Sequence, residues 1–387
     1  MKKSMMMCVV LGLMVSAGVA KADDKAELKS LQEQLKLQKQ ELVKLLAKME
    51  QLEKSQSATQ AEVKDMSWTS DVKVKADLRY RYEHVQTDDS LSKDRQRIRA
   101  RIGLSGKVND EVKAGFRIAT GAGANSGNDT LDDNWADKSI YLDLAYMTYS
   151  PEQVDGLDVT IGKMKKPWYV ATDLIWDGDV NPEGVAANYE TAAGDVELFT
   201  TAGYMILDDQ DESTDWEMFA GQVGGETKLS DNTKLTLAGS VFSYQNSDEV
   251  GVDLDGNPLS EDYTVLQGTA ALGVSEMLPV PVKFYVDAVT NVDADEEENG
   301  YYAGVKFGDA NKADWEVKVD YRELEANAAP DLFVDSDFAG GGTDVKGFRV
   351  KSKYNLSKNF QVGATYIMGE NGSEDVDTLH LDLISKF

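Results

Sequence analysis

A group of basic side chains lies between residues 73 and 117, and most of its members occupy every second position. A period of two places these side chains on one face of extended strands, which is called here the basic wall. Its members are Lys73, Lys75, Arg79, Arg81, Arg95, Arg97, Arg99, Arg101, Lys113 and Arg117. Like charges in such a column repel one another, so we expect the carboxylates of Asp77 and Glu83 to compensate them. Walls of fixed charge select among ions where they line water.

A second group of charges has the opposite sign. It lies in the stretch MKKPWYVATDLIWDGDVNP, residues 164–182, which is called here the acidic loop. Its acidic members, with one residue just beyond it, are Asp173, Asp177, Asp179 and Glu183. The loop also carries apolar residues that would be unfavourable in contact with water, namely Trp168, Tyr169, Leu174, Ile175 and Trp176. Carboxylates facing the basic wall would set up a transverse field that orients dipolar solutes.

Other kinds of chemistry find little support in the residue types. Hydrolysis needs a nucleophile beside an oriented base, and no such constellation is recognisable. The stretch DLDGNPLSED begins like a calcium loop but lacks the glutamate at its twelfth position. The only histidines, His84 and His380, fall on opposite faces of their strands and cannot pair around a metal. We therefore predict no enzyme, no metal site and no cofactor.

The overall charge argues against one class of partner. The chain has 387 residues, with 68 acidic residues against 40 basic ones, which gives a formal net charge of −28. A protein that binds nucleic acid in general needs a positive field along the phosphates. We therefore predict that nucleic acid is not a partner.

The first 22 residues have the pattern of an export signal. Lys2 and Lys3 form a charged start, an apolar run extends to about Val19, and Ala20-Lys21-Ala22 is a cleavage site of the A-x-A type. A membrane anchor is the alternative, but the apolar run is short and the cleavage site is good. Cys8 is the only cysteine, so a chain cleaved after residue 22 has no disulfide and no thiol chemistry.

Residues 23–66 change to a heptad pattern. The apolar a and d positions are occupied by Leu28, Leu31, Leu35, Leu42, Leu45, Met49, Leu52, Val63 and Met66. About six heptads of this kind predict an α-helical coiled coil. Because one helix cannot bury its own apolar seam, the pattern favours self-association. Packing of the helix against the following domain is the alternative.

From residue 67 to residue 387 the pattern is that of β-strands. Alternation of apolar and charged residues recurs in about sixteen segments, the even number expected of a bacterial transmembrane β-barrel. Short turns, for example at 108–110 and 192–194, alternate with long polar connections, for example at 121–137 and 325–343. A soluble β-sandwich gives no reason for that asymmetry. We therefore predict an all-β antiparallel transmembrane barrel with its charged face toward a water-filled lumen and its apolar face toward lipid.

The chain ends TLHLDLISKF, with Leu379, Leu381, Leu383 and Phe387 on one face. This ending resembles that of the Gram-negative outer-membrane porins, which often close on a terminal aromatic residue, although Ser385 departs from the usual apolar residue. Within the porins, the heptads and the segment GKMKKPWYVATDLIWDGDVNPEGVAANY look like the family of putative porins with an N-terminal coiled coil.

The resemblance implies a location, partners and a role for the acidic loop. It implies an outer-membrane barrel with its coiled coil in the periplasm, surrounded by lipid and lipopolysaccharide, inserted by the barrel-assembly machinery and trimeric. It also implies that the acidic loop, as the third external loop, folds inward and narrows the channel. An ordinary external loop with an acidic tip is the alternative.

The function that we predict from these features is passive diffusion of small hydrophilic solutes and ions through a porin. Two alternatives stay open. One is a structural tether whose coiled coil reaches the peptidoglycan of the cell wall, and the other is a solute-specific channel for an anion such as phosphate. The acidic loops predict a weak cation preference, which the arginines of the basic wall oppose.

Overall fold

The computed structural model describes residues 72–387 except for 89–91, 122–124, 211–213, 254–255, 258, 260–261, 276–278 and 312–313. It also describes scattered positions between 33 and 51, all of them helical. The chain divides into two compact units, Met1–Thr69 and Ser70–Phe387. The predicted signal peptide and most of the predicted coiled coil lie outside the described residues. Among the residues that are described, no helix is long and apolar enough to cross a membrane.

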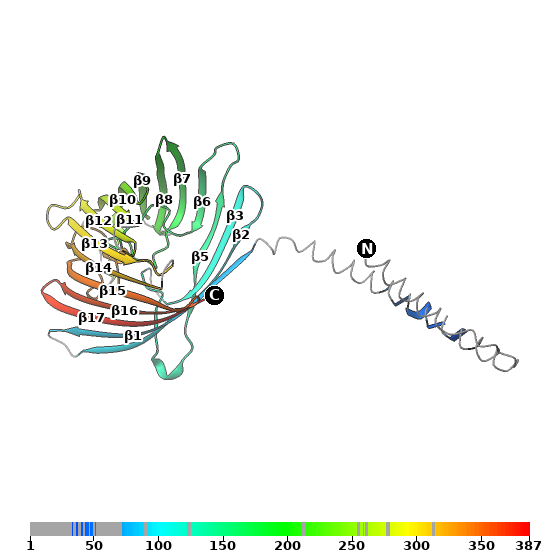
Figure 1. Cartoon of the computed structure of the whole chain (residues 1–387). Coiled ribbons are helices and arrows are strands. Elements are labelled where there is room, and N and C mark those ends of the chain that lie inside the picture. Colours follow the sequence, from blue (N-terminus) through cyan, green and yellow to red (C-terminus); the bar gives the residue numbers. More distant parts are fainter. Residues whose placement is uncertain are drawn as a thin grey trace, which may run out of the picture. The chain divides into compact units, whose positions relative to one another are not determined.

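The second unit is an antiparallel β-barrel. Its strands are β1 (Lys73–Thr87), β2 (Lys93–Lys107), β3 (Val112–Thr120), β4 (Asp129–Thr130), β5 (Ile140–Tyr149), β6 (Leu157–Lys163), β7 (Glu183–Ala193), β8 (Val196–Asp208), β9 (Trp216–Ser230), β10 (Thr233–Gln245), β11 (Thr264–Val274), β12 (Val282–Asn291), β13 (Asn299–Gly308), β14 (Trp315–Leu324), β15 (Val345–Ser357), β16 (Phe360–Asn371) and β17 (Glu374–Lys386). Figure 1 shows the strands other than β4 following one another in chain order around the barrel.

Closure of the barrel comes from pairing of the last strand with the first. In the described part of the chain, β17 pairs with β1 from Asp77–Lys386 to Thr87–Val376. The two-residue strand β4 pairs only with β2 and lies in the connection between β3 and β5. Without β4, sixteen strands form the closed sheet, as the alternation of the sequence predicted.

The two faces of each strand differ as the alternation predicted. On β1, the side chains of Val74 and Leu78 are exposed on the outer face, whereas Arg81 is buried on the inner face. The pleat of a strand directs successive side chains to opposite sides, so alternating apolar and charged residues lie on opposite faces of the sheet. The barrel is therefore apolar outside and polar inside.

The connections at the two ends of the barrel differ in length. Short turns join β2 to β3, β7 to β8, β9 to β10 and β15 to β16. In the turn between β7 and β8, Gly194 has a φ of 64°, a conformation that favours glycine. The opposite end carries the long connections, including residues 121–139, 164–182, 246–263 and 325–344, with the short helices η2 (Asp133–Trp135), α3 (Ser247–Val250) and η3 (Asp331–Phe333).

Candidate functional site: a charged constriction inside the barrel

The acidic loop lies inside the barrel. The rings of Trp168 and Trp176 are 4.9 Å apart, and each is 5.1 Å from the ring of Phe242 on the inner face of β10. The backbone N–H of Tyr169 donates to Gln222 on β9 at 2.7 Å, and the Thr172 hydroxyl donates to Asp287 on β12 at 2.6 Å. The loop is thus anchored against the inner wall from β9 to β12 by both apolar packing and hydrogen bonds.

A second connection, residues 325–344, also packs inside the barrel and is called here the Phe333 loop. The Phe333 ring stacks on Tyr244 at 6.2 Å and lies 6.0 Å from the rings of Trp176 and Trp216. Its carbonyl accepts a 2.8 Å hydrogen bond from the backbone N–H of Asp177 in the acidic loop. The two loops therefore share one hydrophobic core. Sequence reasoning treated the Phe333 loop only as a long polar connection.

The connection between β3 and β5 joins these two loops. The Ser336 hydroxyl donates to the carbonyl of Asn125 at 2.8 Å. The backbone N–H of Gly127 donates to the Asp179 carboxylate at 2.9 Å. Three connections that are remote in sequence therefore meet inside the lumen and hold one another in place.

Two arginines of β14 and β15 bind the carboxylates of both inward loops. Asp173 accepts hydrogen bonds from Arg322 at 2.7 Å and from Arg349 at 2.8 and 2.9 Å. Asp335 forms ion pairs with the same two guanidinium groups at 3.0 and 2.9 Å. Both arginines are almost completely buried. Neither was among the predicted site residues, although the alternation in ADWEVKVDYREL places Arg322 on the charged face of its strand.

The arginines of the basic wall form ion pairs with several carboxylates. Arg81 pairs with Asp337 of the Phe333 loop at 2.6 Å and with Asp382 on β17 at 2.7 Å. Asp77 accepts hydrogen bonds from Arg99 at 3.2 Å and from Arg101 at 2.8 Å.

Asp179 of the acidic loop bridges the same pair of arginines. Its carboxylate lies 3.6 Å from Arg99 and 3.3 Å from Arg101. The loop thus contacts the arginines of β2, as well as packing against the inner wall from β9 to β12. It crosses the lumen between them.

The remaining predicted residues lie outside this contact. Arg95 and Arg97 bind Glu83, the second carboxylate expected to compensate the wall. Arg117 pairs with Asp143. The side chains of three other predicted residues are exposed near strand ends, and they are Lys73, Lys113 and Glu183. Glu183 is the first residue of β7 and pairs with Lys163 at 2.5 Å, so it does not join the acidic loop's other carboxylates.

The loop carboxylates differ in their pKa. Burial and the nearby Asp335 charge raise the pKa of Asp177 to about 7. Burial alone would also raise the pKa of Asp173, but Arg349 and Arg322 hold it well below its usual range. Burial opposes ionisation of Asp179 in the same way, but Arg99, the backbone N–H of Gly127 and Arg101 together outweigh it and lower that pKa. At neutral pH, Asp173 and Asp179 are therefore charged and matched by arginines, whereas Asp177 is near its midpoint.

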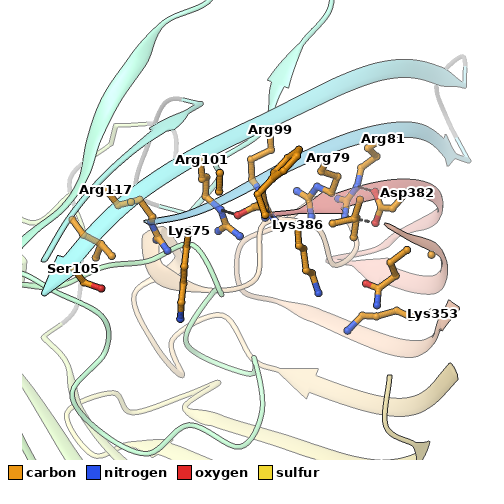
Figure 2. Close-up of a pocket in the computed structure, with 18 of the residues that line it drawn as sticks. Lys75, Arg79, Arg81, Arg99, Arg101, Ser105, Arg117, Lys353, Asp382 and Lys386 are labelled. Atoms are coloured by element: carbon orange, nitrogen blue, oxygen red, sulfur yellow. Dashed lines mark hydrogen bonds and ion pairs between the residues drawn. The ribbon is translucent and has the colours of Figure 1, made fainter. Parts of the chain in front are cut away.

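Cavities remain on the side of the lumen formed by β15–β17 and β1–β3. One of them, called here the basic cavity, has a volume of about 670 Å³. Its charged lining residues are Lys75, Arg79, Arg81, Arg99, Arg101, Arg117, Lys351, Lys353 and Lys386, with Asp77 and Asp382. Figure 2 shows the arginines along strands β1 and β2 and the amine ends of Lys75, Lys353 and Lys386 reaching into the open space.

Two smaller cavities adjoin the basic cavity. One of about 180 Å³ lies between the inward loops and the basic wall, and it shares Arg79, Arg81 and Arg99 with the basic cavity. Another of about 400 Å³ lies toward the long connections, and it shares Arg101 with the basic cavity and Asp179 with the small one. The three cavities thus follow one another past the contact between loop and wall.

A fourth cavity lies under the acidic loop on the opposite side of the lumen. Its volume is about 640 Å³, and it is lined by Tyr169 and Phe199 together with the carboxylates of Glu190, Glu197 and Glu226. The lumen therefore has a basic side and an acidic side at the level of the short turns.

Comparison with known proteins agrees with this architecture. The fold is similar to that of OprB from Pseudomonas putida, with a TM-score of 0.57 at 12% identity over 86% of this chain and 97% of that one. It is also similar to OmpF from Salmonella typhi in complex with daunomycin, with a TM-score of 0.52 at 13% identity over 82% and 97% of the two chains. At such identities the likeness concerns the fold alone. No curated protein matches the sequence.

The sequence itself carries a family signature. The model of the family described as "Putative porin" matches residues 86–253 and 262–387, which together are well over half of the chain. The matched ranges include only the last two residues of β1, but they contain the whole basic wall from Arg95 onward and both inward loops. The chain therefore belongs to this porin family, as the resemblance in its sequence predicted.

Proposed function

We propose that the chain forms a water-filled channel in the outer membrane of a Gram-negative bacterium, through which small hydrophilic solutes and ions diffuse passively. The observation that carries this proposal is the series of three cavities along the basic wall. Each pair of these cavities has lining residues in common, and the shared residues are Arg79, Arg81, Arg99, Arg101 and Asp179. Fixed charges of both signs line them, as in a pore that hydrates its solutes. The apolar outer face of the barrel suits contact with lipid.

Passage would be limited by the contact between the acidic loop and the basic wall. There Asp179 pairs with Arg99 and Arg101, and Asp337 of the Phe333 loop pairs with Arg81. Transport of this kind makes and breaks no covalent bond, so we propose a channel without enzymatic activity. The arginines of the wall and the carboxylates Asp173, Asp177 and Asp179 are the residues that we assign to it.

Reconstitution into a planar lipid bilayer tests the proposal directly. Purified protein should produce stepwise increases in current in potassium chloride, and neutral hydrophilic solutes that fit the pore should reduce the conductance. A barrel that inserts but passes no current would contradict the channel. If, in addition, deletion of residues 24–66 weakened attachment of the outer membrane to the cell wall, the tether would be the better proposal.

We also propose that the protein is a trimer with its coiled coil in the periplasm. The heptads of residues 23–66 support self-association, because a lone helix leaves its apolar seam in water. Leu35→Asp combined with Leu42→Asp places charges in that seam and should lower the oligomeric mass measured in detergent. A double variant with the native mass and heat stability would show that the stem does not hold the subunits together. Lipopolysaccharide, the barrel-assembly machinery and peptidoglycan are the further partners that we propose.

A further inference from the structure

We infer that the basic cavity is a binding site for a small multivalent oxyanion, for which inorganic phosphate is the natural probe. The inference rests on the proposed water-filled channel, because the anion must reach the cavity through it. It goes beyond passive diffusion by assigning a solute class to a defined part of the lumen.

The charges of the cavity are incompletely compensated. Several of its cations have a partner, as Arg117 has Asp143 and Lys353 has Glu316. In the part of the chain that the structure describes, four others form no ion pair, and these are Lys75, Arg79, Lys351 and Lys386. They come from β1, β15 and β17, which lie side by side or one strand apart around the cavity. Four unmatched positive charges around one cavity favour an anion with more than one negative charge.

Hydrogen-bond donors are also left over. The Nε atoms of Arg79 and Arg99 are buried and form no hydrogen bond with the described residues. One guanidinium nitrogen of Arg79 donates to the neutral side-chain oxygen of Asn128 and not to a carboxylate. Buried donors without a partner are uncommon, because each costs free energy. Oxygens of a bound oxyanion would accept from these groups and would lower the repulsion between neighbouring guanidinium groups.

The lining defines the class of ligand further. Charged and small polar side chains dominate the cavity, with Ser105, Ser352, Gln361 and Thr365 among the neutral ones. A sugar or a nucleoside would gain from aromatic stacking surfaces, and Tyr146 is the one aromatic side chain that the lining directs inward. A divalent cation would be repelled. The geometry therefore favours a compact, strongly hydrated anion such as phosphate.

Single-channel recording tests the site. The channel is held in 0.1 M potassium chloride at pH 7.5, and phosphate is added against controls of equal ionic strength made with chloride. We expect phosphate to reduce the current in a saturable way. Lys75→Gln combined with Lys351→Gln should raise the half-blocking concentration roughly tenfold or more, because two charged contacts are lost.

A matched control separates local charge from general effects. Lys346 lies on the same strand as Lys351 but pairs with Glu370 and shares the outer face with Phe348. Lys346→Gln should leave the phosphate block unchanged. Equal block in the double variant and in the wild type would overturn the site, and so would a phosphate effect no larger than that of chloride.

Calorimetric titration of the purified protein with phosphate keeps this inference separate from the proposed function. Heat of binding that disappears in the double variant supports the site even if the reconstituted barrel passes no current. A channel that conducts potassium chloride but shows neither block nor heat of binding overturns the site and leaves passive diffusion standing.

Discussion

The two sides of the lumen are built from strands with the same alternation of inward and outward side chains, but the inward side chains of the two sides differ in chemical type. From β8 to β13, many inward side chains are apolar or aromatic, such as Met205, Met218, Phe242, Val265 and Tyr302. From β15 through β17 to β3, the inward side chains include the charged lining of the basic cavity, such as Arg79, Arg99 and Lys351. The two inward loops cover the apolar side chains of the first side, which keeps a cavity of about 640 Å³ near the short turns. The second side holds the basic cavity.

The inward loops dock where the inner wall of the barrel is apolar. Apolar side chains facing a water-filled lumen are unfavourable, and covering them with Trp168, Trp176 and Phe333 removes that surface from water. On the other side, Arg81, Arg99 and Arg101 pair with carboxylates of the loops. The identity of the inward residues therefore decides against which part of the wall the inward loops pack.

The largest effect of a mutation is expected in the hydrophobic core that the two inward loops share. Trp176→Ala removes a ring that contacts Trp168, Phe242 and Phe333. Loss of a buried tryptophan should weaken the packing by about 3–5 kcal/mol. We expect a lower unfolding temperature by circular dichroism and a larger conductance, because the loops no longer hold their place. Trp135→Ala is the control, since Trp135 is fully exposed. Unchanged conductance would mean that these loops do not limit the pore.

Ion pairs hold the loops at the boundary between the two sides. Breaking one of these pairs should reduce stability somewhat less than removing Trp176. Arg349→Gln leaves Asp173, Asp320 and Asp335 with Arg322 as their shared partner and should cost about 3 kcal/mol. Unfolding in denaturant measures the loss. Lys163→Gln breaks the more exposed pair with Glu183 and should cost at most about 1 kcal/mol. Equal effects of the two variants would show that burial does not strengthen the pairs at the boundary.

Protonation of Asp177 should tune the packing of the acidic loop. Its pKa of about 7 in the folded loop exceeds the ordinary value of about 4, so the packed loop holds a proton that the released loop gives up. Packing should therefore weaken as the pH rises from about 4 to about 7 and stay weakest above that. Hydrogen exchange of residues 164–182, corrected for its intrinsic pH dependence, checks this. Asp177→Asn should flatten the profile, and an undiminished slope in that variant would assign it to another group.

The smallest effect concerns ion selectivity, and it should have opposite signs on the two sides. Arg99→Gln with Arg101→Gln should move the reversal potential in a salt gradient toward cations. Glu190→Gln, in the cavity on the opposite side, should move it toward anions. Each shift should shrink as salt rises, since charges are screened over about 10 Å at 0.1 M. A shift in only one of the two variants would mean that ions pass along one side of the lumen and are insensitive to the other.

The ion pairs of the acidic residues weaken the reason for expecting a cation preference. Asp173 and Asp179 are matched by arginines, and Asp337 is matched by Arg81. Their charges are therefore largely cancelled where the lumen narrows. Four cations of the basic cavity have no ion-pair partner among the residues that the structure describes. The amino-acid composition gives the number of carboxylates, but it does not show which of them are paired with a cation in the folded protein.

The sequence by itself determined the strands, their inward and outward faces and the family. These follow from a local rule: neighbouring side chains of a strand point to opposite sides, so each residue's face can be read from its neighbours. The tertiary structure alone decided that Arg322 meets Asp173, which lies 149 residues earlier, and that the Phe333 loop enters the lumen beside the acidic loop. Such contacts depend on closure of β17 onto β1, which brings remote strands around one lumen, and no local period in the sequence encodes those distances.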